Sequence, residues 1–147
     1  NRPSLAVEDL AGSEYETGLY QFSYYKYFSR LVDANCARLM SLMSSLKSSG
    51  NRIVGYGAAA KACTLLNYCG IDTEILAYLA DLNPNKHGKL MPGVRIPIVP
   101  ADRLTIDQPD YVLLLAWNLK EEVLGQQAEY RKQGGQIILP LPELDVV

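Results

Sequence analysis

Short apolar runs that alternate with stretches of helix-forming residues after Gly50 constrain the fold of this chain most strongly. We interpret the apolar runs as strands at 52–54, 75–79, 96–99, 111–115 and 136–139. Segments 58–68 and 121–133 lie between them and carry helix formers that end at glycine. Strands that alternate with helices in this way form a doubly wound, mainly parallel α/β sheet. We therefore predict an α/β fold for residues 51–147.

A long amphipathic segment precedes this region. Apolar residues recur mostly at steps of three and four until Ser48–Gly50, which predicts a helix over 19–48 that packs on one face of the sheet. Residues 1–18 are acidic and broken by glycine and proline, so we expect a linker or lead-in there. Aromatic residues crowd the start of the helix, at Tyr15, Tyr20, Phe22, Tyr24, Tyr25, Tyr27 and Phe28. They are either ordinary exposed side chains or contacts with another domain or partner.

Charge and cysteine content exclude several classes of protein. The 14 basic and 16 acidic residues give a net charge of -2, so we expect no nucleic-acid partner. No apolar run approaches the roughly 18 residues of a membrane span, and we expect no membrane partner. Cys36, Cys63 and Cys69 are odd in number and lack C-x-x-C spacing. This predicts unpaired cysteines, no metal site and a cytoplasmic localisation.

Three loops would leave the carboxyl ends of the strands, where ligands bind in such sheets. The first, 55–61, fits the G-x-G-x-x-G/A pattern with Gly55, Gly57 and Ala60. Gly55 permits a tight turn, Gly57 permits the close approach of a phosphate, and the following helix N-terminus attracts an anion. Lys61 lies in the first turn of that helix. We interpret the loop as a phosphate or nucleotide contact, and a purely structural turn is the alternative.

The second loop starts at Asp81, at a spacing from the glycines where a carboxylate often binds a ribose hydroxyl. Lys86, His87 and Lys89 then form a local basic patch. A phosphate ligand would explain the patch, and so would solvated loop charges. His87 is the sole histidine, and without a visible carboxylate or serine partner it receives no catalytic role.

The third loop is Ala116–Asn118. Trp117 could stack on a planar or sugar-like ligand, and Asn118 could hydrogen-bond to it. Alternatively, Trp117 covers the core, and Asn118 caps the next helix in a capping box with Glu121.

Several segments occur in one order that resembles a known family. They are Val54–Lys61, Thr64–Ile71, Asp81-x-Asn83-Pro84-x-Lys86-x-Gly88, Pro92–Ile98, Asp110–Tyr111, Ala116–Asn118, Gly134–Gly135 and Pro140-x-Pro142. The set resembles the C-terminal domain of the SAM-dependent sugar C-methyltransferases, which methylate a carbon of a nucleotide-linked deoxysugar. It covers residues 50–145 closely and the preceding helix more loosely. Ala62–Cys63 departs from the family, whose members often carry a small polar residue or glycine there.

The resemblance implies that residues 19–147 are a Rossmann-like C-terminal domain, preceded in the parent enzyme by a zinc-binding region and a SAM-binding domain. S-adenosylmethionine would be bound by that absent domain, so we expect no cofactor and no catalytic residue in this fragment. The expected partners are a nucleotide-linked deoxysugar and the enzyme's own SAM-binding domain. The resemblance assigns diphosphate or sugar binding to Gly55, Tyr56, Gly57, Ala58, Lys61, Asp81, Lys86 and Asn118.

Two other functions share these features. A stand-alone NAD(P)-binding module would use the same glycine motif with Asp81, and a non-catalytic interaction domain would capture a partner through the tyrosine-rich helix. The chain begins with Asn1 in place of Met, which adds to the expectation of a truncated enzyme, inactive by itself.

Overall fold

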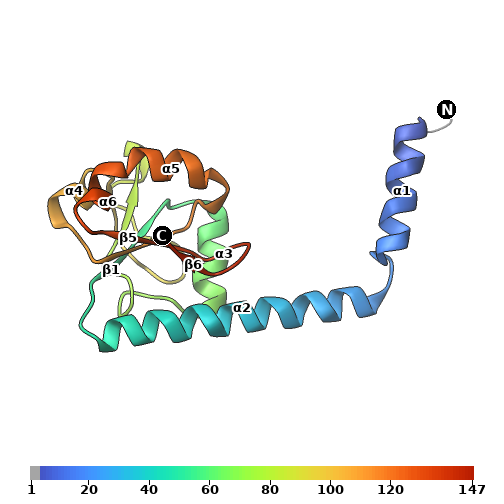
Figure 1. The fold of residues 1–147 in the computed structure, drawn as a ribbon, viewed down its shortest axis with the longest axis horizontal. Helices are drawn as coiled ribbons and strands as arrows, with labels where there is room; N and C mark the ends of the chain where they lie inside the picture. Colours follow the sequence, from blue (N-terminus) through green and yellow to red (C-terminus); the bar gives the residue numbers. More distant parts are fainter. Residues whose placement is uncertain (1–3) are drawn as a thin grey trace. The chain divides into compact units, whose positions relative to one another are not determined.

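The computed structural model describes residues 4–147 (Figure 1). The chain divides into two units, of which the first ends at Ala34 and the second spans Asn35–Val147. In the first unit, α1 (Leu5–Thr17) has no buried residue and ends at Gly18, whose N–H donates to the carbonyls of the last turn. Residues 5–17 of the predicted lead-in are therefore helical, and its residues 1–3 lie outside the described part.

The predicted helix over 19–48 corresponds to α2 (Phe22–Ser48). From Asn35 onward this helix belongs to the second unit, where Leu39 and Met43 are buried in the core. It ends before Gly50, whose φ of 83° reverses the chain toward the sheet.

The second unit is built on a six-stranded sheet in the order β3-β2-β1-β4-β5-β6. The strands are β1 (Ile53–Tyr56), β2 (Leu79–Asp81), β3 (Ile98–Pro100), β4 (Tyr111–Leu114), β5 (Gln136–Leu139) and β6 (Asp145–Val146). The first five pair in parallel, and β6 runs antiparallel to β5. The predicted α/β class is confirmed.

Helices cover both faces of this sheet, which gives the core two layers. The helices after β1 are α3 (Ala60–Cys69), α4 (Arg103–Asp107), α5 (Lys120–Gln126) and α6 (Ala128–Lys132), with 3₁₀ turns η1 (Pro84–Lys86) and η2 (Trp117–Leu119). Figure 1 shows α4, α5 and α6 on one face, with α3 and the last turns of α2 on the other. Successive strand residues alternate between the layers: Ile53 packs with α2 and α3, whereas Val54 packs with α5 and α6.

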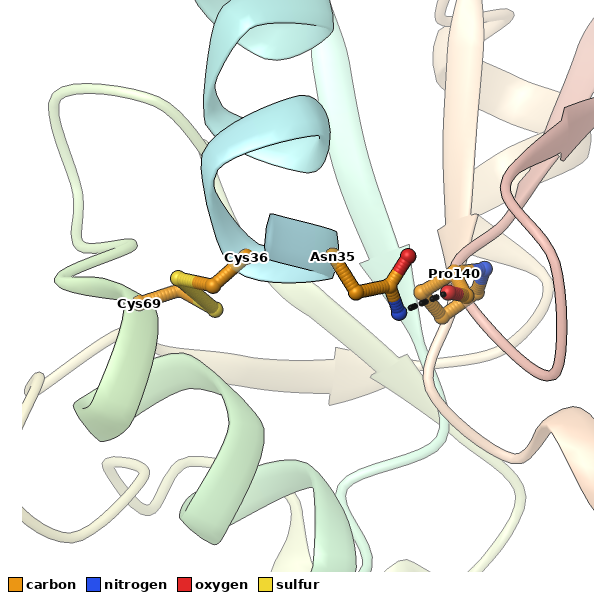
Figure 2. Close-up of a disulfide and its surroundings, with 4 residues drawn as sticks. All are labelled: Asn35, Cys36, Cys69 and Pro140. Carbon is orange, nitrogen blue, oxygen red and sulfur yellow. Dashed lines mark hydrogen bonds between the residues drawn. A yellow bond between two sulfur atoms is a disulfide. The ribbon is translucent and has the colours of Figure 1, made fainter. Parts of the chain in front are cut away.

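The prediction of unpaired cysteines is wrong for one pair. Cys36 of α2 and Cys69 at the end of α3 form a disulfide, as Figure 2 shows, and Cys63 is free. Their Cα atoms lie 5.6 Å apart, within the range that a disulfide spans. The two residues are 33 positions apart, so counting cysteines and local spacings could not reveal a contact that forms only when α2 packs beside α3.

Besides shifts of one to three residues at other element ends, two predicted elements differ more in extent. Residues 75–78 of the predicted second strand lie outside β2. The chain forms a turn before β2, in which the Asp72 carbonyl accepts the N–H groups of Ile75 and Leu76. The predicted helix 121–133 is divided at Gln127 into α5 and α6. Among residues 4–147, no helix combines the length and apolar character that a membrane span requires.

Candidate functional site

The candidate site lies at the loops that follow β1 and β4. These two strands are neighbours at the centre of the sheet, and the strand order reverses between them, with β2 and β3 beyond β1 and with β5 and β6 beyond β4. Gly57, at the end of β1, has a φ of 94°, and a Cβ there would lie 2.9 Å from the Cβ of Ala116. Glycine thus lets the two loops touch. In open α/β sheets, ligands bind in the crevice beyond the carboxyl ends of the strands at this reversal point.

The N-terminus of α3 faces the same edge of the sheet. Its N-cap residue, Ala59, provides no side-chain hydrogen bond, so the N–H groups of the first helical turn lack a capping side chain. The preceding N–H, of Ala58, donates to Asp81 Oδ2 over 2.7 Å. The chain's own carboxylate therefore occupies one donor of the predicted phosphate loop.

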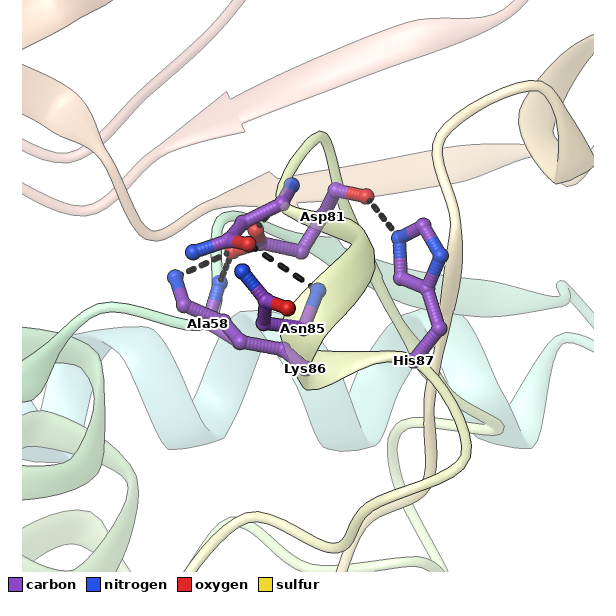
Figure 3. Close-up of polar contacts among 6 residues, drawn as sticks. Ala58, Asp81, Asn85, Lys86 and His87 are labelled. Atoms are coloured by element: carbon purple, nitrogen blue, oxygen red, sulfur yellow. Dashed lines mark hydrogen bonds and ion pairs between the residues drawn. The ribbon is translucent and has the colours of Figure 1, made fainter.

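Asp81 is the only buried charged side chain among residues 4–147, with 6% exposure. It also accepts the N–H of Asn83 at Oδ1 (2.8 Å) and the Lys86 ammonium at Oδ2 (2.9 Å). Figure 3 shows Ala58 and Lys86 beside the Asp81 carboxylate. Burial by itself raises the pKa of the Asp81 carboxyl. The hydrogen bonds outweigh it, and the pKa is lowered, so the carboxylate is charged at neutral pH.

The basic patch predicted around Lys86 turns partly inward. Lys86 is paired with Asp81, and His87 Nε2 lies 2.7 Å from the Asp81 backbone oxygen. Lys89 is exposed. Two of the three basic side chains thus contact Asp81 and stabilise the loop. The His87 ring contacts a backbone carbonyl oxygen, whereas a catalytic acid or base would need to reach a reacting group.

A cavity of about 210 Å³ opens at this edge of the sheet. It is lined by Tyr56, Gly57, Ala59, Asp81, Leu82, Lys86, Ala116, Leu119, Glu122, Val123 and Gln126. The Tyr56 hydroxyl donates to Gln126 Oε1 over 3.3 Å, and burial raises the pKa of that hydroxyl. The structure therefore brings four predicted residues together at one cavity, namely Tyr56, Gly57, Asp81 and Lys86.

The other four predicted residues lie outside the cavity lining. Gly55 sits inside β1, where an added Cβ would collide with the Leu79 side chain. Ala58 contributes its N–H to Asp81. The Lys61 Nζ lies 4.6 Å from the ring centroid of Trp117, in a cation–π contact that compensates its place in the first turn of α3.

Asn118 is exposed within η2. The N-cap of α5 is Leu119, and it makes no side-chain capping bond. The capping box of Asn118 with Glu121 is therefore not formed in the structure.

Sequence reasoning missed Glu122 and Gln126, which line the cavity from α5. Gln126 Nε2 donates to Glu122 Oε1 over 2.9 Å. The available signal was their spacing of four residues on a helix that follows the third loop, which places both side chains on one face.

Within the described residues, no group of three or more histidine, cysteine or acidic side chains is arranged to hold a metal ion.

A mostly parallel sheet with helices on both faces and a cavity at its reversal point defines the molecule as an α/β domain. Comparison with known families makes this specific. The chain belongs to the C-methyltransferase C-terminal domain family, which it matches over residues 1–142. It is also 32% identical, over 142 residues, to C-methyltransferase NovU of Streptomyces niveus. That alignment covers 97% of this chain and 34% of NovU, so the chain spans about a third of the relative's length.

Proposed function

We propose that this chain is the Rossmann-like, nucleotide-sugar-binding part of a SAM-dependent C-methyltransferase that acts on a nucleotide-linked deoxysugar. Family membership supports the methyltransferase assignment. The strand order 3-2-1-4-5-6 supports the Rossmann-like description, because nucleotide-binding sheets share it. The observation that carries the binding role is the cavity beside Gly57 and Asp81, at the reversal point of the sheet.

SAM itself fits this chain poorly. An acidic residue after the second strand would have to offer its carboxylate to the ribose hydroxyls of the cofactor. Asp81 holds that position, yet its oxygens already accept hydrogen bonds from Ala58, Asn83 and Lys86. The same engagement disfavours NAD(P). We therefore propose that SAM is bound by another part of a longer protein and that this fragment is inactive alone.

The first unit supports a second role in contacts within the parent enzyme. Exposed aromatic side chains gather on residues 15–28, with Phe22 82% exposed and Tyr20 68% exposed. Aromatic residues are enriched in protein interfaces. We propose that the enzyme's own SAM-binding domain is their partner.

Calorimetry of this chain with thymidine diphosphate glucose and with SAM tests the proposed binding role. We expect binding of the sugar nucleotide and none of SAM. Binding of SAM without the sugar nucleotide would overturn the proposal.

Replacing Lys61 by Ala should weaken sugar-nucleotide binding and reduce its dependence on salt, because an ammonium near a diphosphate contributes an electrostatic attraction that salt screens.

A further inference from the structure

The charges around the cavity beside Gly57 do not favour a phosphate. Its charged lining residues are Asp81, Lys86 and Glu122. Lys86 is bound to Asp81 at 2.9 Å, so these two charges compensate each other. Glu122 receives a hydrogen bond from the neutral Gln126 amide, and no described cation forms an ion pair with it. The rim of the cavity therefore carries one negative charge without an ion-pair partner, on the exposed side chain of Glu122, and this charge disfavours a diphosphate beside it.

The polar groups of the cavity instead suit hydroxyl groups. The Glu122 carboxylate accepts hydrogen bonds, and the Gln126 amide and the Tyr56 hydroxyl both donate and accept them. Leu119, Val123 and Ala116 add apolar wall on the same lining. A sugar ring presents the matching combination of hydroxyl groups and C–H surface.

The size of the cavity limits what enters it. Its volume of about 210 Å³ is smaller than pockets for drug-sized ligands, which are roughly 300–1,000 Å³. It has room for one ring of a sugar nucleotide and not for the whole molecule. The Lys61 ammonium, which lies over Trp117 outside the lining, remains available to the diphosphate.

From these observations we infer that the cavity accepts an uncharged, hydroxyl-bearing ring of the sugar nucleotide and excludes its diphosphate, with Glu122 as a residue that determines this specificity. The inference rests on the proposed function. Two rings of the ligand share the required chemistry, the deoxysugar and the deoxyribose of the nucleotide, and the test separates them.

The test is calorimetry of the 147-residue chain with thymidine, thymidine diphosphate and thymidine diphosphate glucose, for the wild type, Glu122→Gln and Glu121→Gln. Glu121 is the matched control, because it is an exposed carboxylate on α5, as Glu122 is, but does not line the cavity. We expect Glu122→Gln to weaken binding of the sugar nucleotide about 5- to 10-fold, in line with replacing a charged hydrogen-bond acceptor by a neutral one, and Glu121→Gln to leave it unchanged.

The three ligands identify the bound ring. If the sugar attached to the diphosphate occupies the cavity, Glu122→Gln weakens only thymidine diphosphate glucose. If the deoxyribose occupies it, all three ligands lose affinity equally. Unchanged affinity of Glu122→Gln for the sugar nucleotide would overturn the inference and leave the proposed function intact. Absence of binding by the wild type would instead overturn the proposed function and the inference with it.

Discussion

The backbone N–H of Ala58 donates to Asp81 Oδ2 over 2.7 Å, which ties the loop after β1 to the end of β2. In a nucleotide-binding sheet, N–H groups of this loop face a phosphate. Here a buried carboxylate fills part of that role, so the loop is anchored by the protein itself. Asp81 thus contributes to stability as well as bounding the candidate site.

Replacing Asp81 by Asn should lower the free energy of unfolding by about 2 kcal/mol at pH 7, because hydrogen bonds to a buried charged group are lost. Chemical denaturation measures this change. Asp72→Asn is the control, since the Asp72 side chain is exposed and accepts a local hydrogen bond from the N–H of Glu74. Equal stability of Asp81→Asn and the wild type would contradict the prediction.

The contribution of Asp81 should also depend on pH. Its pKa in the folded protein is lowered from 3.8, so folding favours the charged form. The stabilisation is fully present above the pKa of the unfolded chain and is lost as pH falls through the lower folded pKa. Denaturation curves from pH 7 to pH 2 should therefore show the difference between wild type and Asp81→Asn shrinking below about pH 4. A difference that stays constant would exclude the linkage.

Gly57→Ala should destabilise the second unit by about 2–4 kcal/mol. This figure is the sum of two costs, that of a side chain on a backbone with positive φ and that of a crowded contact. The new Cβ would approach Ala116 at 2.9 Å. Gly50→Ala separates the two effects: its φ is 83°, but an added Cβ meets nothing within 4 Å, so we expect only about 1 kcal/mol. Thermal and urea unfolding of both variants provide the comparison, and equal losses would show that the contact with Ala116 costs nothing.

Loss of the Cys36–Cys69 disulfide should cost roughly 3–4 kcal/mol, from the entropy gained by the unfolded chain when a loop of this length opens. Cys36→Ala should show this loss in urea denaturation. Cys63→Ala serves as the control, because Cys63 is a free cysteine. Reductant should therefore lower the stability of Cys63→Ala as much as it lowers that of the wild type.

Alkylation of the unfolded, unreduced protein gives a direct check on the same pairing. One thiol should react without reductant and three with it, since two of the three cysteines are joined. Three reactive thiols without reductant would show that the pair is not oxidised in the purified protein.

Two buried tyrosines should respond differently to removal of the hydroxyl. The Tyr130 hydroxyl donates to the Pro109 carbonyl over 2.8 Å, whereas the buried Tyr78 hydroxyl has no hydrogen-bond partner among the described residues. Tyr130→Phe should therefore cost about 1–2 kcal/mol, and Tyr78→Phe should be neutral or stabilising. Urea denaturation of the pair tests this, and a larger loss for Tyr78→Phe would reverse the assignment.

Tyr78 should also weaken the fold at alkaline pH. Burial, assisted by the nearby Asp107 carboxylate, raises its pKa from 10.0 to about 12. Its contribution is complete below pH 10 and is lost as pH rises toward 12, because the unfolded chain releases the proton first. Tyr78→Phe should lose less stability than the wild type over this interval, and parallel curves would contradict the prediction.

Much of the sheet could be predicted because its strands are apolar on both faces. The run 111–115 contains β4, and the run 136–139 coincides with β5. The second strand was placed too early because Ile75 and Leu76 are as apolar as strand residues, although they belong to a turn closed by backbone hydrogen bonds to Asp72. Composition does not distinguish a buried turn from a buried strand over so few residues.

The candidate site was predictable only in part. The glycine pattern located Gly57, and the position after the second strand located Asp81. That the Asp81 carboxylate turns back onto Ala58 depends on a contact between loops 23 residues apart, which no local pattern encodes. Glu122 and Gln126 resemble ordinary surface residues of a helix until the fold places them at the cavity.

The central sheet separates the core into two side-chain clusters, one against α2 and α3 and the other against α5 and α6. This partition makes the domain modular for engineering. Substitutions at Leu66 and Val123, which belong to different clusters, should change stability by amounts that simply add. Substitutions at Leu66 and Met43, within one cluster, should depend on each other. One layer can then be repacked to strengthen the scaffold while the layer that borders the cavity keeps its native side chains.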